Sequence, residues 1–271
     1  MEKILFLIKL EWLKLKTYMP FMVLMGMYVV LLPLFMSVGL SINLPKQLGD
    51  ARSFYMFPTV WQTLGYVGNW LCYFIMGFIA VLTVTNEFSN RTLRQNIISG
   101  VSRLDFYLSK VYFLFLVALG ATAYYVIVAL IYGFTFTETV YASRVMDNID
   151  MIPRYLLMIV TFMSFGLMLG VLLRKTGIAL FLYFAYIMFI ERIIRYLVIG
   201  KLFGSKDLLV YAPINAANDL TPFPFPKMVT TMTENADIKL FLSPTQATVT
   251  AVVFTILFLY LAFYQLKTRD L

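Results

Sequence analysis

Residues 86–110 read NEFSNRTLRQNIISGVSRLDFYLSK, a polar and basic stretch between two of the longest uncharged runs in the chain. The run before it, residues 53–86, contains 34 residues without a charged side chain, and the run after it, residues 111–137, contains 27. About 20 helical residues, rising about 1.5 Å each, cross the hydrocarbon core of a bilayer. Both runs are therefore predicted to span a membrane, and residues 86–110 to lie in water on one side.

The composition agrees with a membrane protein. Of 271 residues, 61% are hydrophobic and 13% are charged, and the mean hydropathy is +0.82. An ordinary soluble domain has about 25% charged residues. The apolar runs are continuous and do not alternate with polar residues, which favours helices over a transmembrane β-barrel. We predict an all-α integral membrane protein with a single transmembrane domain over residues 1–271.

Several kinds of chemistry are excluded by what the sequence lacks. It has no His and one Cys, Cys72, which excludes His-based catalysis, His/Cys metal sites and a disulfide within one chain. The phosphate-binding pattern G-x-x-x-x-G-K-[ST] is also absent, since Gly200-Lys201 is followed by Leu202. We expect no catalytic residue, no metal site, no cofactor bound by this chain and no nucleic-acid partner.

Residues 1–17 are predicted to form an amphipathic helix that lies in the membrane interface. Apolar residues share one helical face, Glu11 and Lys14 lie on another, and Trp12 is expected at the level of the lipid headgroups. A signal peptide is the alternative, but four charged residues interrupt the apolar run and no small-residue cleavage site follows promptly. We therefore expect this segment to stay attached.

Six spans follow from the uncharged runs. Gly166 and Gly170 have the small-xxx-small spacing that lets membrane helices approach closely. The Pro-rich residues 200–244 are too short and broken for a soluble domain, and are predicted to contain short external re-entrant or interfacial helices. The predicted spans are residues 20–40, 62–85, 111–136, 155–173, 177–199 and 245–266.

An even number of spans places both termini on one side of the membrane. The side with the termini and residues 86–110 carries twelve Lys and Arg, against eight in the loops of the other side, and the net charges are +7 and 0. Basic residues are retained in the cytoplasm. Both termini and residues 86–110 are therefore expected to face the cytoplasm.

The fifth apolar run contains charges that a span rarely tolerates. Glu191 and Arg195 are four residues apart and could pair on one helical face. Two interpretations remain open. Either the span kinks or ends near Glu191 and leaves the charges among the external headgroups, or Glu191 lines a substrate pathway and faces Gln62 or Asn69 of the second span.

Residues 86–110 can transmit force as well as fix topology. A charged helix held between two spans would carry movement of a cytosolic partner into the membrane without a flexible linker. Arg94 and Arg103 could bind such a partner through charge-assisted hydrogen bonds, and Leu93 with Ile97 and Ile98 could supply an apolar contact. Alternatively, the Arg side chains anchor the segment to anionic headgroups.

The same stretch resembles the permease subunits of type-2 ATP-binding-cassette (ABC) exporters, which share an interfacial helix, six spans and the pattern E-x(4)-T-L-R-x(7)-S-R. Arg91 and Gly100 depart from that pattern, at positions where such permeases often have Gly and Pro. The matching residues are Glu87, Thr92, Leu93, Arg94, Ser102 and Arg103, followed by Phe106 and Lys110.

The resemblance implies a partner and a location. In that family the segment is a coupling helix that docks on a separate cytosolic ATPase subunit, which binds ATP and Mg. Two such ATPases act with two permeases, so we expect a homodimer, or a pair with a similar permease, among the lipids of the cytoplasmic (inner) membrane. Two alternatives are a secondary transporter or channel with an ion path near Glu191, and a membrane scaffold without transport activity. The first of these predicts an internal repeat, and none is visible between the two halves of the sequence.

Overall fold

The computed structural model describes residues 2–40, 51–90, 92–98, 100–197, 210–224 and 241–268. Within these ranges the chain is helical and contains no strand. Six helices are long and apolar enough to cross a membrane, as the sequence predicts. The helix before the first span is α1 (Glu2–Leu15). The six spans are α2 (Met19–Leu40), α3 (Thr59–Ser89), α5 (Arg103–Phe136), α7 (Met151–Leu173), the sequence of α8 (Thr176–Ala185), η3 (Tyr186–Ile190) and α9 (Glu191–Ile193), and α12 (Pro244–Thr268).

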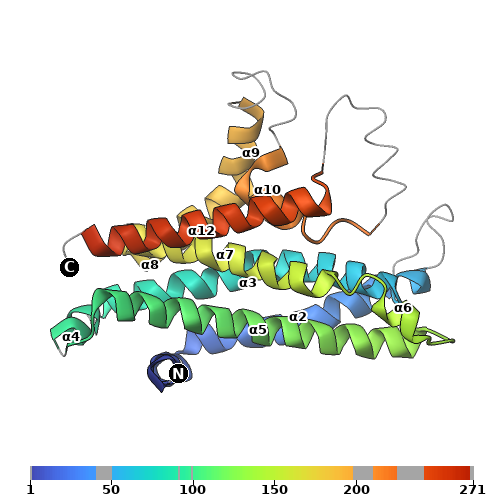
Figure 1. Cartoon of the computed structure of the whole chain (residues 1–271), viewed down its shortest axis with the longest axis horizontal. Helices are drawn as coiled ribbons and strands as arrows, with labels where there is room; N and C mark the ends of the chain where they lie inside the picture. Colours follow the sequence, from blue (N-terminus) through green and yellow to red (C-terminus); the bar gives the residue numbers. More distant parts are fainter. Residues whose placement is uncertain are drawn as a thin grey trace.

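Short helices join or cap these spans. They are η2 (Ala51–Phe54), α4 (Thr92–Ile98), α6 (Ala142–Met146) and α10 (Pro213–Asn218). Helix α10 belongs to the Pro-rich stretch for which external helices are predicted, and most of that stretch lies outside the described residues. Figure 1 shows α2, α3, α5, α7 and α12 running lengthwise, with α4 and the last turn of α12 at one end and α6 at the other. We call these the α4 end and the α6 end.

Helices α3 and α5 extend further than predicted at the α4 end. Helix α3 continues to Ser89, and α5 begins at Arg103, eight residues before the expected start of its span. The hydroxyl of Ser102 accepts a hydrogen bond from the Asp105 amide (3.0 Å), so Ser102 is the N-cap that starts α5 early. Of residues 86–110, only residues 90–102 therefore lie between the two long helices, and the others belong to the ends of α3 and α5.

Helix α3 is the centre of the bundle and packs against α2, α5, α7 and α8. Its closest approach is to α7, where a Cβ on Gly166 would lie 2.6 Å from the carbonyl oxygen of Gly77. Contact this close requires Gly at position 166 of α7, because a methyl group there would push the two backbones apart. The small-xxx-small spacing predicted from Gly166 and Gly170 is thus a packing feature of the α3–α7 pair.

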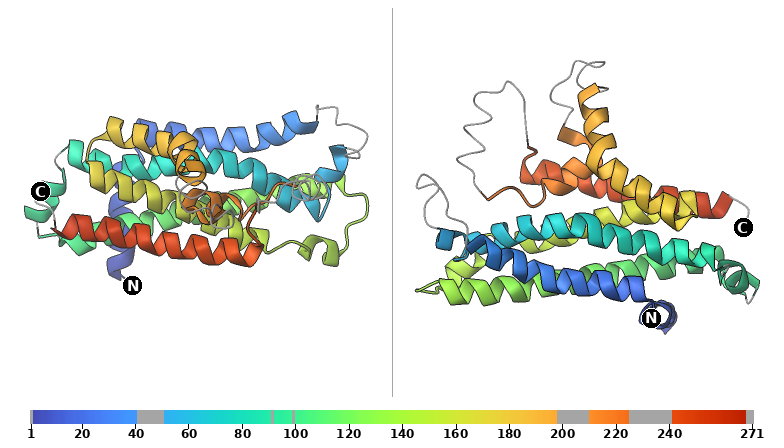
Figure 2. Two further views of the ribbon diagram at one scale, coloured as in Figure 1. Left: turned by 90° about the horizontal axis from the view of Figure 1, so that it is seen from above. Right: turned by 180° about the vertical axis from the view of Figure 1, so that it is seen from behind.

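Helix α1 lies across the lengthwise helices, as Figures 1 and 2 show. Its buried side combines Leu7 and Leu15 with one charged residue, Glu11. Trp12 and Leu5 are about half exposed or more (49% and 62%), whereas Glu11 is fully buried against the bundle. Exposed apolar and aromatic side chains on such a helix suit the membrane interface, while the buried Glu11 needs polar partners inside the bundle.

The fifth span is kinked. Its helix widens into a π-helical stretch over η3, and the hydroxyl of Tyr73 on α3 donates a hydrogen bond (2.9 Å) to the Ile187 carbonyl inside that stretch. Such local widening is a recognised cause of helix kinks. Figure 1 shows α9 rising steeply away from the lengthwise helices, so this span bends before Glu191.

Candidate functional site

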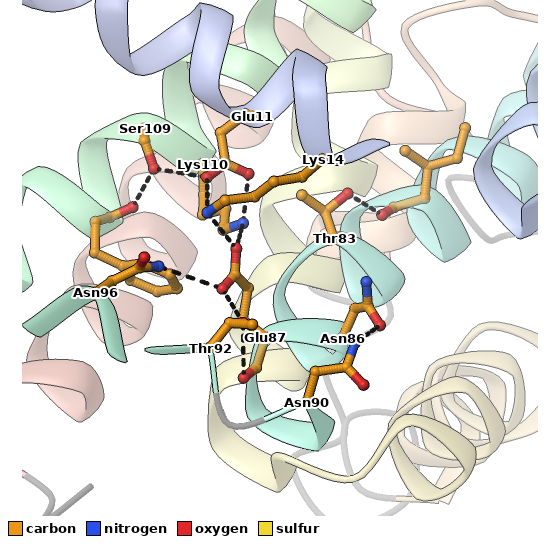
Figure 3. A network of polar contacts seen from close by, with 12 residues as sticks. Glu11, Lys14, Thr83, Asn86, Glu87, Asn90, Thr92, Asn96, Ser109 and Lys110 are labelled. Atoms are coloured by element: carbon orange, nitrogen blue, oxygen red, sulfur yellow. Dashed lines mark hydrogen bonds and ion pairs between the residues drawn. The ribbon is translucent and has the colours of Figure 1, made fainter. Parts of the chain in front are cut away.

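Four charged side chains meet inside the bundle near the α4 end (Figure 3). Glu87, in the last turn of α3, pairs with Lys14 of α1 at 2.7 Å and with Lys110 of α5 at 2.9 Å. Glu11 of α1 pairs with Lys110 at 2.5 Å and with Lys14 at 3.3 Å. Two carboxylates and two ammonium groups thus alternate in a ring with no net charge, which we call the charge cluster.

The charge cluster is deeply buried. The exposed fractions of Glu11, Glu87 and Lys110 are 0%, 4% and 2%, while Lys14 is half-buried. An isolated charge at such depth would cost several kcal/mol, so each member depends on its partners. A cleft of about 250 Å³ reaches the cluster from the side of Asn86 and Asn90. The cluster is therefore a buried polar contact between helices that a cleft reaches from outside.

Helix α4 is attached to the charge cluster through Glu87. The Thr92 hydroxyl donates a hydrogen bond to the Glu87 carboxylate, and the Asn96 amide donates a longer one (3.5 Å) to the same oxygen. Thr92 and Asn96 are one turn apart on α4, so both lie on one face of that short helix. On the opposite side, Ser109 of α5 donates to Glu11 (3.3 Å). Four helices, α1, α3, α4 and α5, are joined at this point.

The predicted coupling residues divide into inward and outward groups. Glu87 and Thr92 point into the charge cluster, and Leu93 is 3% exposed and packs in the core. The prediction that Leu93 forms an apolar contact with a partner is therefore corrected, because its side chain is already buried. The side chains of Arg94 and Ile97 lie outside the described part of the structure. Described and exposed on α4 are Gln95 and Ile98, and Ile98 is 85% exposed.

Arg103 and Ser102 hold helix ends. The guanidinium of Arg103 donates hydrogen bonds to the carbonyl oxygens of Leu266 (3.2 Å) and Lys267 (2.9 Å), in the last turn of α12. A cation at a helix C-terminus complements both the unpaired carbonyls and the helix dipole. Arg103 thus connects the start of α5 to the end of α12, a role that the sequence pattern does not indicate.

Three of the four predicted pathway residues, Glu191, Arg195 and Asn69, contact α10. The Glu191 carboxylate accepts hydrogen bonds from the amides of Ile214 (3.0 Å) and Asn215 (2.8 Å), in the first turn of that helix. Arg195 donates to the side-chain oxygen of Asn215 (2.7 Å). Glu191 and Arg195 of the fifth span are therefore both bound to α10, a helix that lies well after them in the sequence.

Asn69 of α3 holds the other end of α10. Its side-chain amide donates to the Asn218 carbonyl (3.2 Å) and to the Thr221 hydroxyl (2.9 Å). Gln62 is half-buried, two turns earlier on α3. The span kinks before Glu191, as the first interpretation expects. Glu191 is 4% exposed, and the hydrogen bonds described for its carboxylate come from α10 amides and not from Gln62 or Asn69. Its carboxylate is satisfied by a helix N-terminus.

The six long apolar helices, and the charge cluster to which α4 is attached, define a multi-pass membrane protein. Residues 7–202, nearly three quarters of the chain, match the family model described as ABC-2 family transporter protein. The chain belongs to this family. The matched region contains every member of the charge cluster and all of α4. No curated protein matches the sequence.

Family membership fixes the general role of the chain. It is a membrane subunit of an ABC transporter, it crosses the membrane several times, and it works with an ATP-binding partner subunit. A membrane component of this kind is not itself an ATPase.

Proposed function

We propose that this chain is the permease subunit of an exporter, and that a cytosolic ATPase docks on α4 and moves the spans through the charge cluster. The observation that carries the proposal is the attachment of α4 to Glu87. Through Glu87 the short helix is fixed to α3, and through Lys14 and Lys110 to α1 and α5.

This arrangement suits the transmission of movement. Two residues separate α3 from α4, and the side chain of Leu93, on α4, is buried in the core. Helix α4 therefore has little freedom to move on its own. A displacement of α4 would therefore be passed to α3. Because α3 packs against four other spans, its movement would reach most of the bundle. Gln95 and Ile98 offer the exposed surface for the partner, and Arg94 adds a charge by the sequence pattern.

The orientation and assembly follow from charge and resemblance. The excess of basic residues supports a cytoplasmic α4 end and cytoplasmic termini in the inner membrane. Outward transport, two ATPase copies with ATP and Mg, and a second permease, identical or similar, rest on the family resemblance. The substrate is not identified by any residue described above. Membership of an ABC transporter family argues against an ion-driven carrier, a channel or a scaffold.

Co-purification in mild detergent tests the docking surface. Ile98→Glu places a charge on the exposed side of α4, and we expect it to reduce the co-purified ATPase at least fivefold; Arg94→Glu should act in the same direction. Met146→Glu is the matched control, because Met146 is also a highly exposed apolar residue (61%) on a short helix, but lies at the α6 end. That variant should retain the ATPase.

The same preparations report the assembly. Native mass measurement is expected to show two permeases with two ATPases, and a complex with one permease would contradict the dimer. Undiminished ATPase with both Ile98→Glu and Arg94→Glu would rule out docking on this surface and leave Arg94 as a headgroup anchor.

A further inference from the structure

A groove between α5, α7 and α12 is separate from the charge cluster and from α10. Its volume is about 240 Å³, and its floor is formed by α7 with Val160, Met163 and Leu167. Leu114 of α5 and Leu259 of α12 form its walls. Figure 1 shows the three helices side by side on one face of the bundle.

The groove is apolar and open at its rim. Seven of the nine described side chains that line it are hydrocarbon or thioether, and the exceptions are Tyr112 and Ser164. The Ser164 hydroxyl already donates to the Val160 carbonyl (2.7 Å), so it offers little to a polar ligand. Phe115 at the rim is 46% exposed. An apolar cavity is not filled favourably by water, and in a membrane the available solvent is the lipid chain.

The side chains between the start of α5 and the groove follow the order of the parts of a lipid molecule, from headgroup to acyl chain. Along α5, Arg103 and Tyr107 precede Val111 of the groove at four-residue spacing, so the three share one face. Tyr107 closes the gap to α12, since its hydroxyl donates to the Leu259 carbonyl (2.8 Å) and its ring lies 5.3 Å from that of Phe263. From the helix start inward, this face is basic, then aromatic, then aliphatic.

Helix α12 repeats the same order from its own end. Lys267 is exposed, Phe263 lies one turn further in, and Leu259 belongs to the groove. Eight residues separate the basic position from the groove on each helix, which is about 12 Å along the axis. Arg103 and Lys267 are adjacent, because Arg103 donates to the Lys267 carbonyl (2.9 Å). The Arg103 guanidinium and the backbone of Lys267 thus lie together about two turns from the groove, at the depth where a phosphate would be found above a chain seated in it.

We propose that this groove binds an anionic phospholipid, with one acyl chain between α5, α7 and α12 and the phosphate beside Arg103 and Lys267. The charge complementarity at the rim selects a lipid over a second copy of the chain, whose spans would bring apolar residues to this position. Tyr107 and Phe263 would lie at the interface, where aromatic rings are preferred.

Native mass spectrometry of the full permease in detergent tests the site. After delipidation, phosphatidylglycerol or phosphatidylethanolamine is added back. Val111→Trp fills the groove and should weaken phosphatidylglycerol binding at least tenfold, whereas Leu119→Trp, an exposed position two turns along α5, should leave binding unchanged. Lys267→Gln should reduce the preference for the anionic lipid at least threefold.

A second measurement uses the unaltered protein, so that it does not depend on the folding of any variant. Phosphatidylglycerol with a photoreactive acyl chain should crosslink to peptides of α5, α7 and α12. Equal binding by Val111→Trp and Leu119→Trp, or crosslinks confined to other helices, would overturn the proposal. So would a loss of permease dimer in Val111→Trp without a change in bound lipid, because a second copy would then cover the groove.

Discussion

Lys110 is the residue on which the charge cluster depends most. Its ammonium group lies between Glu11 and Glu87, and its side chain is 2% exposed. Removing one partner from a buried ionic network leaves an uncompensated charge, and this is far more costly than removing the network as a whole. The loss of Lys110 would leave two carboxylates to share Lys14.

Lys110→Met is therefore expected to lower the free energy of unfolding by about 3–5 kcal/mol. Lys16→Met is the control. Lys16 is exposed and directly follows α1, the helix that carries Glu11, so its loss should change stability by less than about 0.5 kcal/mol. Thermal unfolding in detergent measures both. Adding Glu11→Gln to Lys110→Met restores neutrality and should recover part of the loss. If Lys110→Met is as stable as Lys16→Met, the charge cluster does not hold the helices together.

At the scale of helices, the α3–α7 contact is the tightest backbone approach described. A Cβ at Gly166 would lie 2.6 Å from the Gly77 carbonyl oxygen, and Gly77 itself lies under the ring of Tyr183. Neither helix can move aside without disturbing the spans packed on α3. The added methyl group would therefore strain this pair.

Gly166→Ala should destabilise the permease by about 1–3 kcal/mol, the usual cost of overpacking a core. Gly120→Ala on α5 is the matched control: nothing lies within 4 Å of its added methyl group, so the higher helix propensity of Ala should leave stability equal or slightly raised. Unfolding temperatures of the two variants in one detergent provide the comparison. A Gly166→Ala protein as stable as wild type would show that the two helices are free to separate.

The sequence predicts the helices better than their ends and partners. Uncharged runs place the spans because the bilayer fixes their length, and Gly166 indicates close packing because its spacing is local. The early start of α5 depends on one hydroxyl, Ser102, which the charge pattern does not reveal. The pairing of Glu11 with Lys110 joins residues 99 positions apart, and Glu191 accepts hydrogen bonds from amides of α10, which lies well after it in the sequence. Such contacts are set by tertiary packing, so composition and periodicity leave them open.

At the scale of the whole molecule, the charge cluster and the contacts around α10 are polar centres at separate places in the bundle. The charge cluster fastens the α4 end, and α10 connects α9, α3 and the approach to α12. The α10 centre includes Asp219, which is 7% exposed and accepts hydrogen bonds from the Leu242 amide (3.0 Å) and the Asn215 side chain (3.1 Å). The first of these bonds links α10 to the segment that enters the last span.

The pH dependence of stability is expected to originate in part at Asp219. Burial raises the pKa of its carboxyl group to about 7, although the hydrogen bond from Leu242, the charge of Arg195 and the Asn215 side chain oppose this. The unfolded pKa is about 3.9, so the folded protein binds a proton more tightly. The resulting stability is fully present below about pH 4 and is lost as the pH rises through about 7, by about 1.4 kcal/mol per unit between them.

Asp219→Asn keeps a neutral side chain of the same shape at every pH. Its unfolding temperature should change less than that of wild type between pH 5 and pH 8, and should exceed the wild-type value at pH 8. Parallel pH profiles for the two proteins would mean that Asp219 stays ionised throughout, with its charge satisfied by the contacts around α10.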